Sequence, residues 1–341
     1  MQQGSRPTIT DVARIAGVSK TTVSYVLSGP EERAARISEE TANRVLSAAR
    51  EVGYVPNESA RSLRMRRTNR VLFLGGRLNS LYSQAMAQSI ERALVTHGLS
   101  LGVQIGSSTE HIERAVAALG QHLADGLIVE SNDLHLPELR RAATRGHAVV
   151  AIGPSRPEPA FDVMSFDIAP AVREAMSHLV DRRYRHFVLL YPFAKPEDDF
   201  RIHVAHQRLQ ELGIPENAIT LIHCAHDRIA AHECALRFLP GMPHPVAVYA
   251  GSDVSAIGVL WASIRLGRNV PTDVGIVGHG NTPEISITVP GITSLGPVTT
   301  DFTRAADLMA SRLRKPSLPG RFITEPYLLT IRESTQQSLA P

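Results

Sequence analysis

Polar residues gather in the segment 20–27, where they alternate with apolar residues at helical spacing. The apolar members, Val23, Val26 and Leu27, share one face of a helix and leave a polar face opposite. That polar face carries Lys20, Thr21, Ser24 and Tyr25. Hydroxyl and ammonium groups near the start of a helix can hydrogen-bond the edges of bases in the major groove of DNA. The segment therefore predicts a helix that reads a base sequence.

Two further helices are expected to position that face. Thr10 is a candidate N-cap for a helix in which Asp11 complements the positive helix end. Gly17 is expected to end this helix, Val18 to fill the gap between helices, and Ser19 to cap the next one. The apolar face of the first helix would consist of Val12, Ile15 and Ala16. Two short helices joined by a tight glycine turn are typical of a helix-turn-helix.

A third helix and a basic segment follow. Ser38 is the expected cap of a helix that ends at Gly53, and its apolar stripe would be Val45, Leu46, Ala49 and Val52. The segment 54–57 is expected to be an extended link. The segment 58–67 is weakly helical and strongly basic, and it carries Leu63 without an evident core partner.

The composition indicates a folded protein of two or three domains. The chain has 341 residues, of which 43% are hydrophobic and 20% charged, so a normal globular core is expected. Residues 1–70 contain 12 Lys or Arg against 7 Asp or Glu, which leaves 24 against 26 for the rest. A basic first module on a near-neutral body favours a polyanionic partner for that module, although a merely basic solvated surface stays possible. No signal peptide or membrane span is expected, and two cysteines provide no disulfide framework, so we expect a cytoplasmic protein.

From Arg70 onward, short apolar runs alternate with amphipathic segments. The runs VLFLGG, LSLGVQIG, GLIVE, AVVAIG, FVLLYP, AITLIHC, AVYAG and VGIVGHG are candidate strands, and helices are expected near 84–97 and 111–123. This alternation predicts parallel sheets covered by helices on both faces, and about ten strands suit two lobes better than one. A ligand would then bind near the carboxyl ends of the strands, between the lobes.

Enzyme and metal signals are weak. The turn containing Gly278 and Gly280 lacks the third glycine of a dinucleotide site, and no nucleophile elbow, phosphate loop or HExxH motif occurs. The cluster around His223 contains both cysteines, but Cys224 and Cys234 are expected to be small core residues of a strand and a helix rather than zinc ligands. We therefore predict no enzyme activity, no cofactor and no metal.

Three motifs in order resemble the headpiece and hinge of the lactose-repressor and galactose-repressor family. They are TITDVARIAGVSKTTVSYVL, ISEETANRVLSAAREVGYVPN and SARSLRMRRT, and the resemblance extends to the C-terminal IREST, which is similar to that family's closing strand. It implies that Lys20, Thr21 and Tyr25 face the bases, whereas Ser19, Thr22 and Asn57 steady the DNA backbone. Ser24, on the same outward face, is a further candidate DNA contact. It further implies that Leu63 wedges into the minor groove, with Arg61 and Arg64 at the phosphates.

Two features depart from the family pattern. Tyr25 stands where many members carry an arginine that reads guanine, so we expect an altered operator preference. The loop 28–36 is longer than usual; it is expected to be solvated, with a phosphate contact through Arg33 or Arg36 as the alternative.

The resemblance also implies an effector site. The body is similar to periplasmic sugar-binding proteins, and Arg201 and Asp253 match family residues that clamp a polar ligand. Leu81 and Tyr82 fall in a loop that is usually Asn-Pro-aromatic-aromatic, while Lys195 and His226 match loosely. A common Gly-Phe-Asp-Asp turn is replaced by residues 278–281, Gly-His-Gly-Asn. A sugar or sugar derivative is expected, with a purine, another small polar effector or no effector as alternatives.

These inferences combine into an α+β multidomain chain. It would comprise an all-α headpiece (1–56), a hinge (57–69), a two-lobed α/β body of the periplasmic-binding-protein type with parallel sheets (70–334), and a tail (335–341). We expect a homodimeric transcriptional regulator, a repressor, that binds a palindromic double-stranded operator and has no membrane association.

Overall fold

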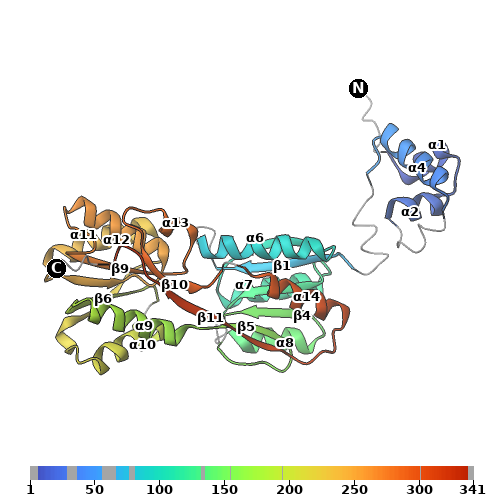
Figure 1. Cartoon of the computed structure of the whole chain (residues 1–341). Coiled ribbons are helices and arrows are strands. Elements are labelled where there is room, and N and C mark those ends of the chain that lie inside the picture. The colour runs from blue at the N-terminus through green and yellow to red at the C-terminus, as the bar shows by residue number, and fades with distance from the viewer. Residues whose placement is uncertain are drawn as a thin grey trace. The chain divides into compact units, whose positions relative to one another are not determined.

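A computed structural model describes the chain over residues 7–28, 37–55, 67–76, 81–131, 135–153, 155–193, 195–299 and 301–336. Contacts within the chain divide it into two compact units, Met1–Asn69 and Arg70–Pro341. We call the first unit the headpiece and the second the body, and we describe each separately (Figure 1). No helix among these residues is long and apolar enough to cross a membrane.

The headpiece contains α1 (Ile9–Ala16), α2 (Lys20–Ser28) and α4 (Glu39–Glu51). Gly17 ends α1 with φ of 63°, the left-handed conformation that glycine adopts without strain. Ser19 caps α2, because its hydroxyl accepts a hydrogen bond from the Thr22 backbone N–H at 3.0 Å. Ser38 caps α4 in the same way through Thr41. The predicted helix-turn-helix with its glycine turn is thus confirmed.

Three local predictions for the headpiece are wrong. The cap of α1 is Thr8 rather than Thr10, since Thr8 donates to the Asp11 carboxylate from its backbone N–H at 2.9 Å and from its hydroxyl at 2.8 Å. Ile15 is 37% exposed and Leu46 is 36% exposed, so neither belongs to the core. A short helix buries only a narrow stripe of its side chains in the core, and residues at the edge of that stripe remain exposed to solvent.

Side chains of all three helices form the small core of the headpiece. The fully enclosed side chains are Val12, Val23 and Val45, one from each helix. Val18, in the turn, packs against them as predicted. Since Val23 faces this core, the opposite side of α2 is held outward.

The first lobe of the body is a parallel sheet with helices on both faces. Its strands are β1 (Arg70–Gly75), β2 (Ser100–Ile105), β3 (Gly126–Glu130), β4 (Ala148–Ile152) and β5 (Asp162–Asp167). Its helices are α6 (Leu81–Thr96), α7 (Thr109–Gly120), α8 (Leu136–Thr144) and α14 (Thr303–Arg314). One core cluster lies under α6 and α14, and another lies under α7 and α8.

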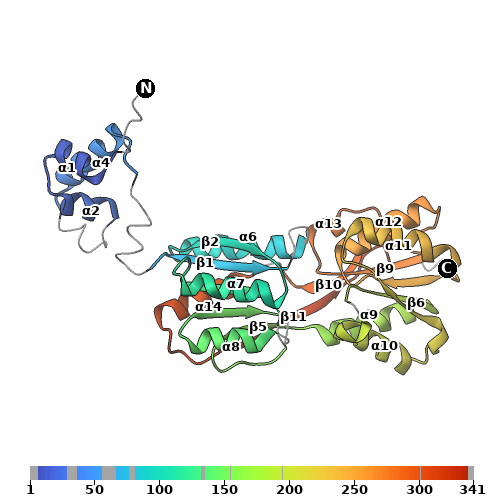
Figure 2. The same cartoon turned by 180° about the vertical axis from the view of Figure 1, so that it is seen from behind.

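The second lobe repeats this layout. Its strands are β6 (His186–Tyr191), β7 (Ile219–His223), β8 (Val246–Tyr249), β9 (Val274–His279) and β10 (Thr293–Pro297). Its helices are α9 (Ile168–Asp181), α10 (Phe200–Glu211), α11 (Arg228–Phe238), α12 (Asp253–Arg265) and the short α13 (Pro283–Ser286), with 3₁₀ turns η2 (Pro196–Asp198), η3 (Glu216–Ala218) and η4 (Leu239–Gly241). Helices α9 and α10 cover one face, and α11 and α12 cover the other (Figure 2).

Strand β11 (Phe322–Thr330) joins the two lobes. Its first half pairs with β5 in parallel, through Phe322–Pro326, and its second half pairs with β10 in antiparallel, through Tyr327–Thr330. The strand order is therefore β2-β1-β3-β4-β5-β11-β10-β9-β8-β6-β7. Figure 1 shows β11 running from one lobe into the other. Tyr327 is the first residue on the second-lobe side of this change of partner.

All eight predicted strands are confirmed, but β5, β10 and β11 were not anticipated. The predicted helices near 84–97 and 111–123 are α6 and α7, which begin three and two residues earlier and end one and three residues earlier, respectively. The segment 331–335 is not a closing strand; β11 precedes it. Ser334 and Thr335 are fully buried there, and their hydroxyl groups form hydrogen bonds inside the body. Ser334 Oγ donates to the Ile276 carbonyl at 2.6 Å.

Candidate functional site

The outward face of α2 carries the residues predicted to read DNA. Lys20 and Thr21 are exposed, whereas Thr22, Ser24 and Tyr25 are partly exposed. Because Val23 is fully buried, α2 cannot rotate about its axis without losing its core contact. The headpiece therefore presents a fixed row of hydroxyl, phenol and ammonium groups on an α-helix of major-groove size.

Other predicted DNA contacts lie outside the described residues. These are Asn57, Arg61, Leu63 and Arg64, together with the loop arginines Arg33 and Arg36. Their predicted roles remain predictions.

In the body, Arg201 is fixed by three hydrogen bonds. Its Nε and one terminal nitrogen donate to the two carboxylate oxygens of Asp199, at 2.7 and 2.6 Å, and the other terminal nitrogen donates to the Gly251 carbonyl at 3.0 Å. A guanidinium has five N–H groups, so two remain for a further acceptor. Asp199 is 2% exposed, and as the N-cap of α10 it also accepts from the Arg201 backbone N–H.

Burial alone would lower the pKa of Arg201, but the Asp199 carboxylate outweighs it, and the pKa is raised. Arg201 therefore stays charged, and its charge is already balanced inside the protein. The site thus supplies directed N–H donors without an excess of positive charge.

Asp253 lies close by but is not the partner of Arg201. Its two oxygens accept hydrogen bonds from Ser294 Oγ at 2.6 Å and from the Thr282 backbone N–H at 2.7 Å. Burial raises the pKa of Asp253 to about 6, although these hydrogen bonds oppose the rise. Gly278 and Gly280 pass against its carboxylate, where a Cβ would stand 2.4 and 3.1 Å from its oxygens. Asp253 therefore holds the 278–282 turn in place.

Two histidines and a tyrosine complete the second-lobe part of the cluster. His279 Nδ1 lies 2.9 Å from the Tyr249 hydroxyl. Burial, together with Arg201 and His226, holds the pKa of His279 well below its usual value, so its imidazole is neutral. His226 stands beside Gly251, since a Cβ on that glycine would lie 3.2 Å from His226 Nε2. The structure thus brings the predicted residues Arg201, His226 and Asp253 together.

The first lobe contributes Tyr82, Leu81 and an acidic residue that sequence reasoning missed. Glu130, at the end of β3, accepts from the Gly76 backbone N–H at 3.0 Å and from Ser83 Oγ at 2.7 Å. Burial and this carboxylate raise the pKa of Tyr82. Leu81 and Tyr82 open α6, and the Tyr82 ring meets Phe302 edge-on at 5.6 Å.

Lys195 lies apart from these hydrogen bonds. It is exposed and precedes η2, four residues before Asp199. The structure gives no reason to place its ammonium group beside the Arg201 guanidinium, whose planar fork of N–H groups we call the Arg201 fork.

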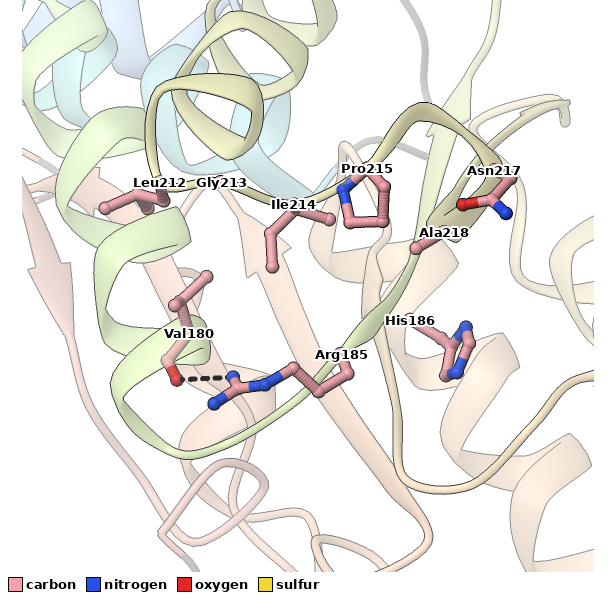
Figure 3. Close-up of a pocket in the computed structure, with 9 residues that line it drawn as sticks. All are labelled: Val180, Arg185, His186, Leu212, Gly213, Ile214, Pro215, Asn217 and Ala218. Carbon is pink, nitrogen blue, oxygen red and sulfur yellow. Dashed lines mark hydrogen bonds between the residues drawn. The ribbon is translucent and has the colours of Figure 1, made fainter.

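A hollow lies elsewhere in the body, away from the Arg201 cluster. Its volume is about 440 Å³, and it lies at the amino-terminal ends of β6 and β7, where Arg185, His186 and Asn217 face a mostly apolar wall (Figure 3). Arg185 donates to the Val180 carbonyl at 3.2 Å there. None of the six predicted effector residues lines this hollow.

Sequence reasoning missed Asp199, Tyr249, Glu130 and Tyr327. Only Asp199 had a local signal, since a carboxylate two residues before Arg201 at a helix start can both cap the helix and pair with the arginine. The others meet through the pairing of strands that lie far apart in the sequence.

Comparisons with known proteins identify both units. Residues 8–57 match the family model "Bacterial regulatory proteins, lacI family", and residues 176–335 match a periplasmic binding protein-like domain. The HTH-type transcriptional regulator PtxS of Pseudomonas putida is 31% identical over 339 residues, covering 97% of this chain and 96% of the relative. The HTH-type transcriptional repressor PurR of Salmonella typhi is 26% identical and covers 84% of each chain.

Solved structures show the same fold. A lac repressor dimer bound to operator and the anti-inducer ONPF has a TM-score of 0.82 at 22% identity, covering 98% of this chain and all of that one. A complex of the transcriptional regulator CelR with cellobiose has a TM-score of 0.65 at 26% identity, covering 96% of this chain. With an N-terminal helix-turn-helix followed in the sequence by a two-lobed body, the chain belongs to the lacI family of bacterial regulatory proteins and is a transcriptional regulator rather than an enzyme.

Proposed function

We propose that the chain is a cytoplasmic repressor that binds a palindromic operator as a homodimer. Its affinity for the operator changes when it binds a small polar effector. The observation that carries the DNA-binding part is the outward face of α2, which Val23 holds in a fixed orientation. Lys20 and Thr21 at its exposed start are in position to meet bases or phosphates.

The homodimer is supported by apolar side chains on the outer helices of the second lobe. Trp261 and Ile264 of α12 are 46% and 58% exposed, and Ile229 of α11 is 65% exposed. Large apolar groups gathered on neighbouring helices favour contact with another protein surface. A two-fold dimer would present two headpieces to two half-sites, and the similar lac repressor structure is also a dimer.

The effector part rests on the Arg201 fork and its neighbours. Two guanidinium N–H groups and the neutral His279 imidazole suit a ligand with several oxygen acceptors, and the Glu130 carboxylate of the first lobe suits a hydroxyl donor. A sugar or sugar derivative has both. Similar solved structures hold ribose, lactose and cellobiose.

The DNA-binding part is tested by selecting the operator from a randomised library and measuring affinity against salt. Thr21→Ala should weaken the selected site about tenfold or more while sparing non-specific binding. Lys20→Ala should reduce the slope of log affinity against log salt by about 1 if it meets a phosphate. His203→Ala, an exposed change on α10, is the matched control and should alter neither quantity. Equal affinity of the Thr21 variant for the selected site would remove α2 from base recognition.

Leu63 is tested on the same DNA, because we propose it as the minor-groove wedge. Leu63→Ala should weaken operator binding and leave effector binding unchanged, since it would remove only the side chain that inserts between base pairs. An operator affinity equal to that of the wild type would refute the wedge.

The effector part is tested by thermal shift with ribose, lactose and cellobiose, and then with phosphosugars and purines. A ligand that binds only the folded body raises its melting temperature by mass action. A purine hit would replace the sugar proposal, and a thermal shift that persists in Arg201→Ala as fully as in His203→Ala would show binding outside the Arg201 site.

A further inference from the structure

Tyr327 occupies a special place in the body. It lies on β11 at the residue where that strand stops pairing with β5 of the first lobe and begins pairing with β10 of the second. Its side chain is buried, with 5% of the residue exposed. The ring is therefore enclosed where the two lobes share a strand.

Rings from both lobes hold the Tyr327 side chain. Phe166 of β5 meets it edge-on at 5.7 Å, and His279 of β9 lies against it at 5.0 Å and 34°. Contacts of this kind fix a ring in position. Phe166 is joined in turn to Phe302, and Phe302 to Tyr82, at 6.2 and 5.6 Å. A continuous row of rings thus connects the two parts of the candidate site.

The Tyr327 hydroxyl is unusual. Within the part of the chain that the structure describes, no hydrogen bond joins it to another group. The other deeply buried tyrosines differ: Tyr184 donates to the Pro271 carbonyl at 2.6 Å, and Tyr249 pairs with His279. The Tyr327 oxygen is nevertheless not among the buried polar atoms that lack a partner, so it reaches solvent and is free to hydrogen-bond a ligand.

The groups that act on this hydroxyl belong to the candidate site. Burial raises the pKa of Tyr327 well above its usual value, and the charges and phenols that also act on it are Tyr82, Tyr249, Asp253 and Arg201. These residues come from α6, β8, α12 and α10, which are the elements that carry the candidate site. An un-ionised phenol among them can donate one hydrogen bond and accept another.

We propose that Tyr327 is a specificity-determining effector contact, whose hydroxyl hydrogen-bonds an oxygen of an uncharged, polyhydroxylated effector. The assignment rests on the proposed effector control. Two polar groups beside it carry no net charge: His279, whose ring lies against Tyr327, is an uncharged imidazole, and Asp199 balances Arg201. Such a set suits hydroxyl and ring oxygens better than a phosphate, which would require uncompensated positive charge.

The contact would also connect the ligand to both lobes. Since β11 pairs with β5 and β10, a ligand oxygen held by Tyr327 is held by the strand that both sheets share. A ligand that prefers one arrangement of the lobes shifts the population towards it only through contacts that differ between the two arrangements. Tyr327 is placed to provide such a contact.

The test compares two variants that each remove one phenolic oxygen. Tyr327→Phe should leave the melting temperature of the ligand-free protein unchanged or raised, because no protein partner is lost. Tyr184→Phe should lower it by about 2–4 °C, because the Pro271 carbonyl loses its donor. A drop for Tyr327→Phe equal to that of Tyr184→Phe would overturn the proposal.

The second measurement uses ribose, glucose, lactose and cellobiose as probes, titrated by calorimetry. For the probe that binds best, Tyr327→Phe should raise the dissociation constant about fivefold to tenfold, and Tyr184→Phe should leave it unchanged. Binding by the wild type with an unchanged constant in Tyr327→Phe would refute the Tyr327 contact alone. If no sugar binds the wild type, the sugar effector itself fails, and the contact proposed here fails with it.

Discussion

Replacing Asp162 by Asn should destabilise the body severely, because this carboxylate is enclosed by two arginines. Asp162 is fully buried and accepts from Arg312 Nε and a terminal nitrogen, each at 2.9 Å. It also accepts from the Arg321 backbone N–H, Nε and a terminal nitrogen, again at 2.9 Å. The three residues come from β5, from α14 and from the approach to β11, so one side chain joins three segments.

The expected loss follows from what the variant leaves behind. Arg312 is 2% exposed, and without Asp162 its charge would be buried with no carboxylate beside it. Removing one partner of a buried ion pair lowers the free energy of unfolding by about 3–5 kcal/mol. For a unit of this size, each kcal/mol lowers the melting temperature by about 2–4 °C. We therefore expect Asp162→Asn to melt at least about 6 °C below the wild type.

Calorimetry of the full chain measures this, because the headpiece and the body are separate units. Glu211→Gln is the matched control. Glu211 bonds two arginines as well, Arg173 and Arg208, but all three are partly exposed to solvent, which screens their charges. Its melting temperature should stay close to the wild-type value. A drop of less than about 2 °C for Asp162→Asn would refute the reasoning, since it would mean that Arg312 finds another partner.

The same carboxylate predicts a pH dependence. Burial pushes the pKa of Asp162 upward, but the hydrogen bonds from Arg321 and Arg312 outweigh it and hold the pKa below its ordinary value. A lowered folded-state pKa gives stability that is fully present above the unfolded value of about 3.9 and is lost as pH falls below it. The difference between the wild type and Asp162→Asn should therefore narrow below about pH 4.

Three further changes are predicted. Gly17→Ala should destabilise the headpiece by about 1–2 kcal/mol, since alanine is strained at φ of 63°, and headpiece melting would measure it. Arg201→Lys should weaken effector binding about tenfold or more while sparing operator affinity, because an ammonium cannot reproduce the fork held by Asp199; equal effector affinity in a titration would contradict this. Trp261→Glu should convert a dimer to a monomer in sedimentation, and a persisting dimer would place the interface elsewhere.

The sequence predicts those parts of the fold whose signals are local. Gly17, Ser19 and Ser38 act within a few residues of their own positions, so the end of α1 and the starts of α2 and α4 could be read directly. Buried strands such as β3 and β4 are continuous apolar runs. Strand β5 was missed because Asp162 and Asp167 stand at its ends, and charged residues are typical of loops unless a distant partner, here Arg312, lies opposite.

The candidate site could be predicted only in part for the same reason. Arg201 and Asp253 follow from a family resemblance, but that resemblance does not show which carboxylate pairs with the arginine. The structure assigns Asp199 to it, two residues away, and uses Asp253 to hold Thr282 and Ser294. A match between a residue and a family position therefore predicts which part of the fold the residue lies in, but it does not predict its hydrogen-bond partner.

That reassignment bears on the effector that we propose. If Asp253 paired with Arg201, the fork would be occupied by the protein's own turn, and a ligand would have to displace it. With Asp199 as partner, the charge of Arg201 is balanced by a carboxylate of the protein, while two guanidinium N–H groups remain available to a ligand. A neutral ligand then gains directed hydrogen bonds without leaving a charge unpaired, whereas an anion gains little Coulomb energy over water. Selectivity among neutral ligands must then come from the position of uncharged groups, and His279 and Tyr327 are fixed against each other at 5.0 Å to provide it.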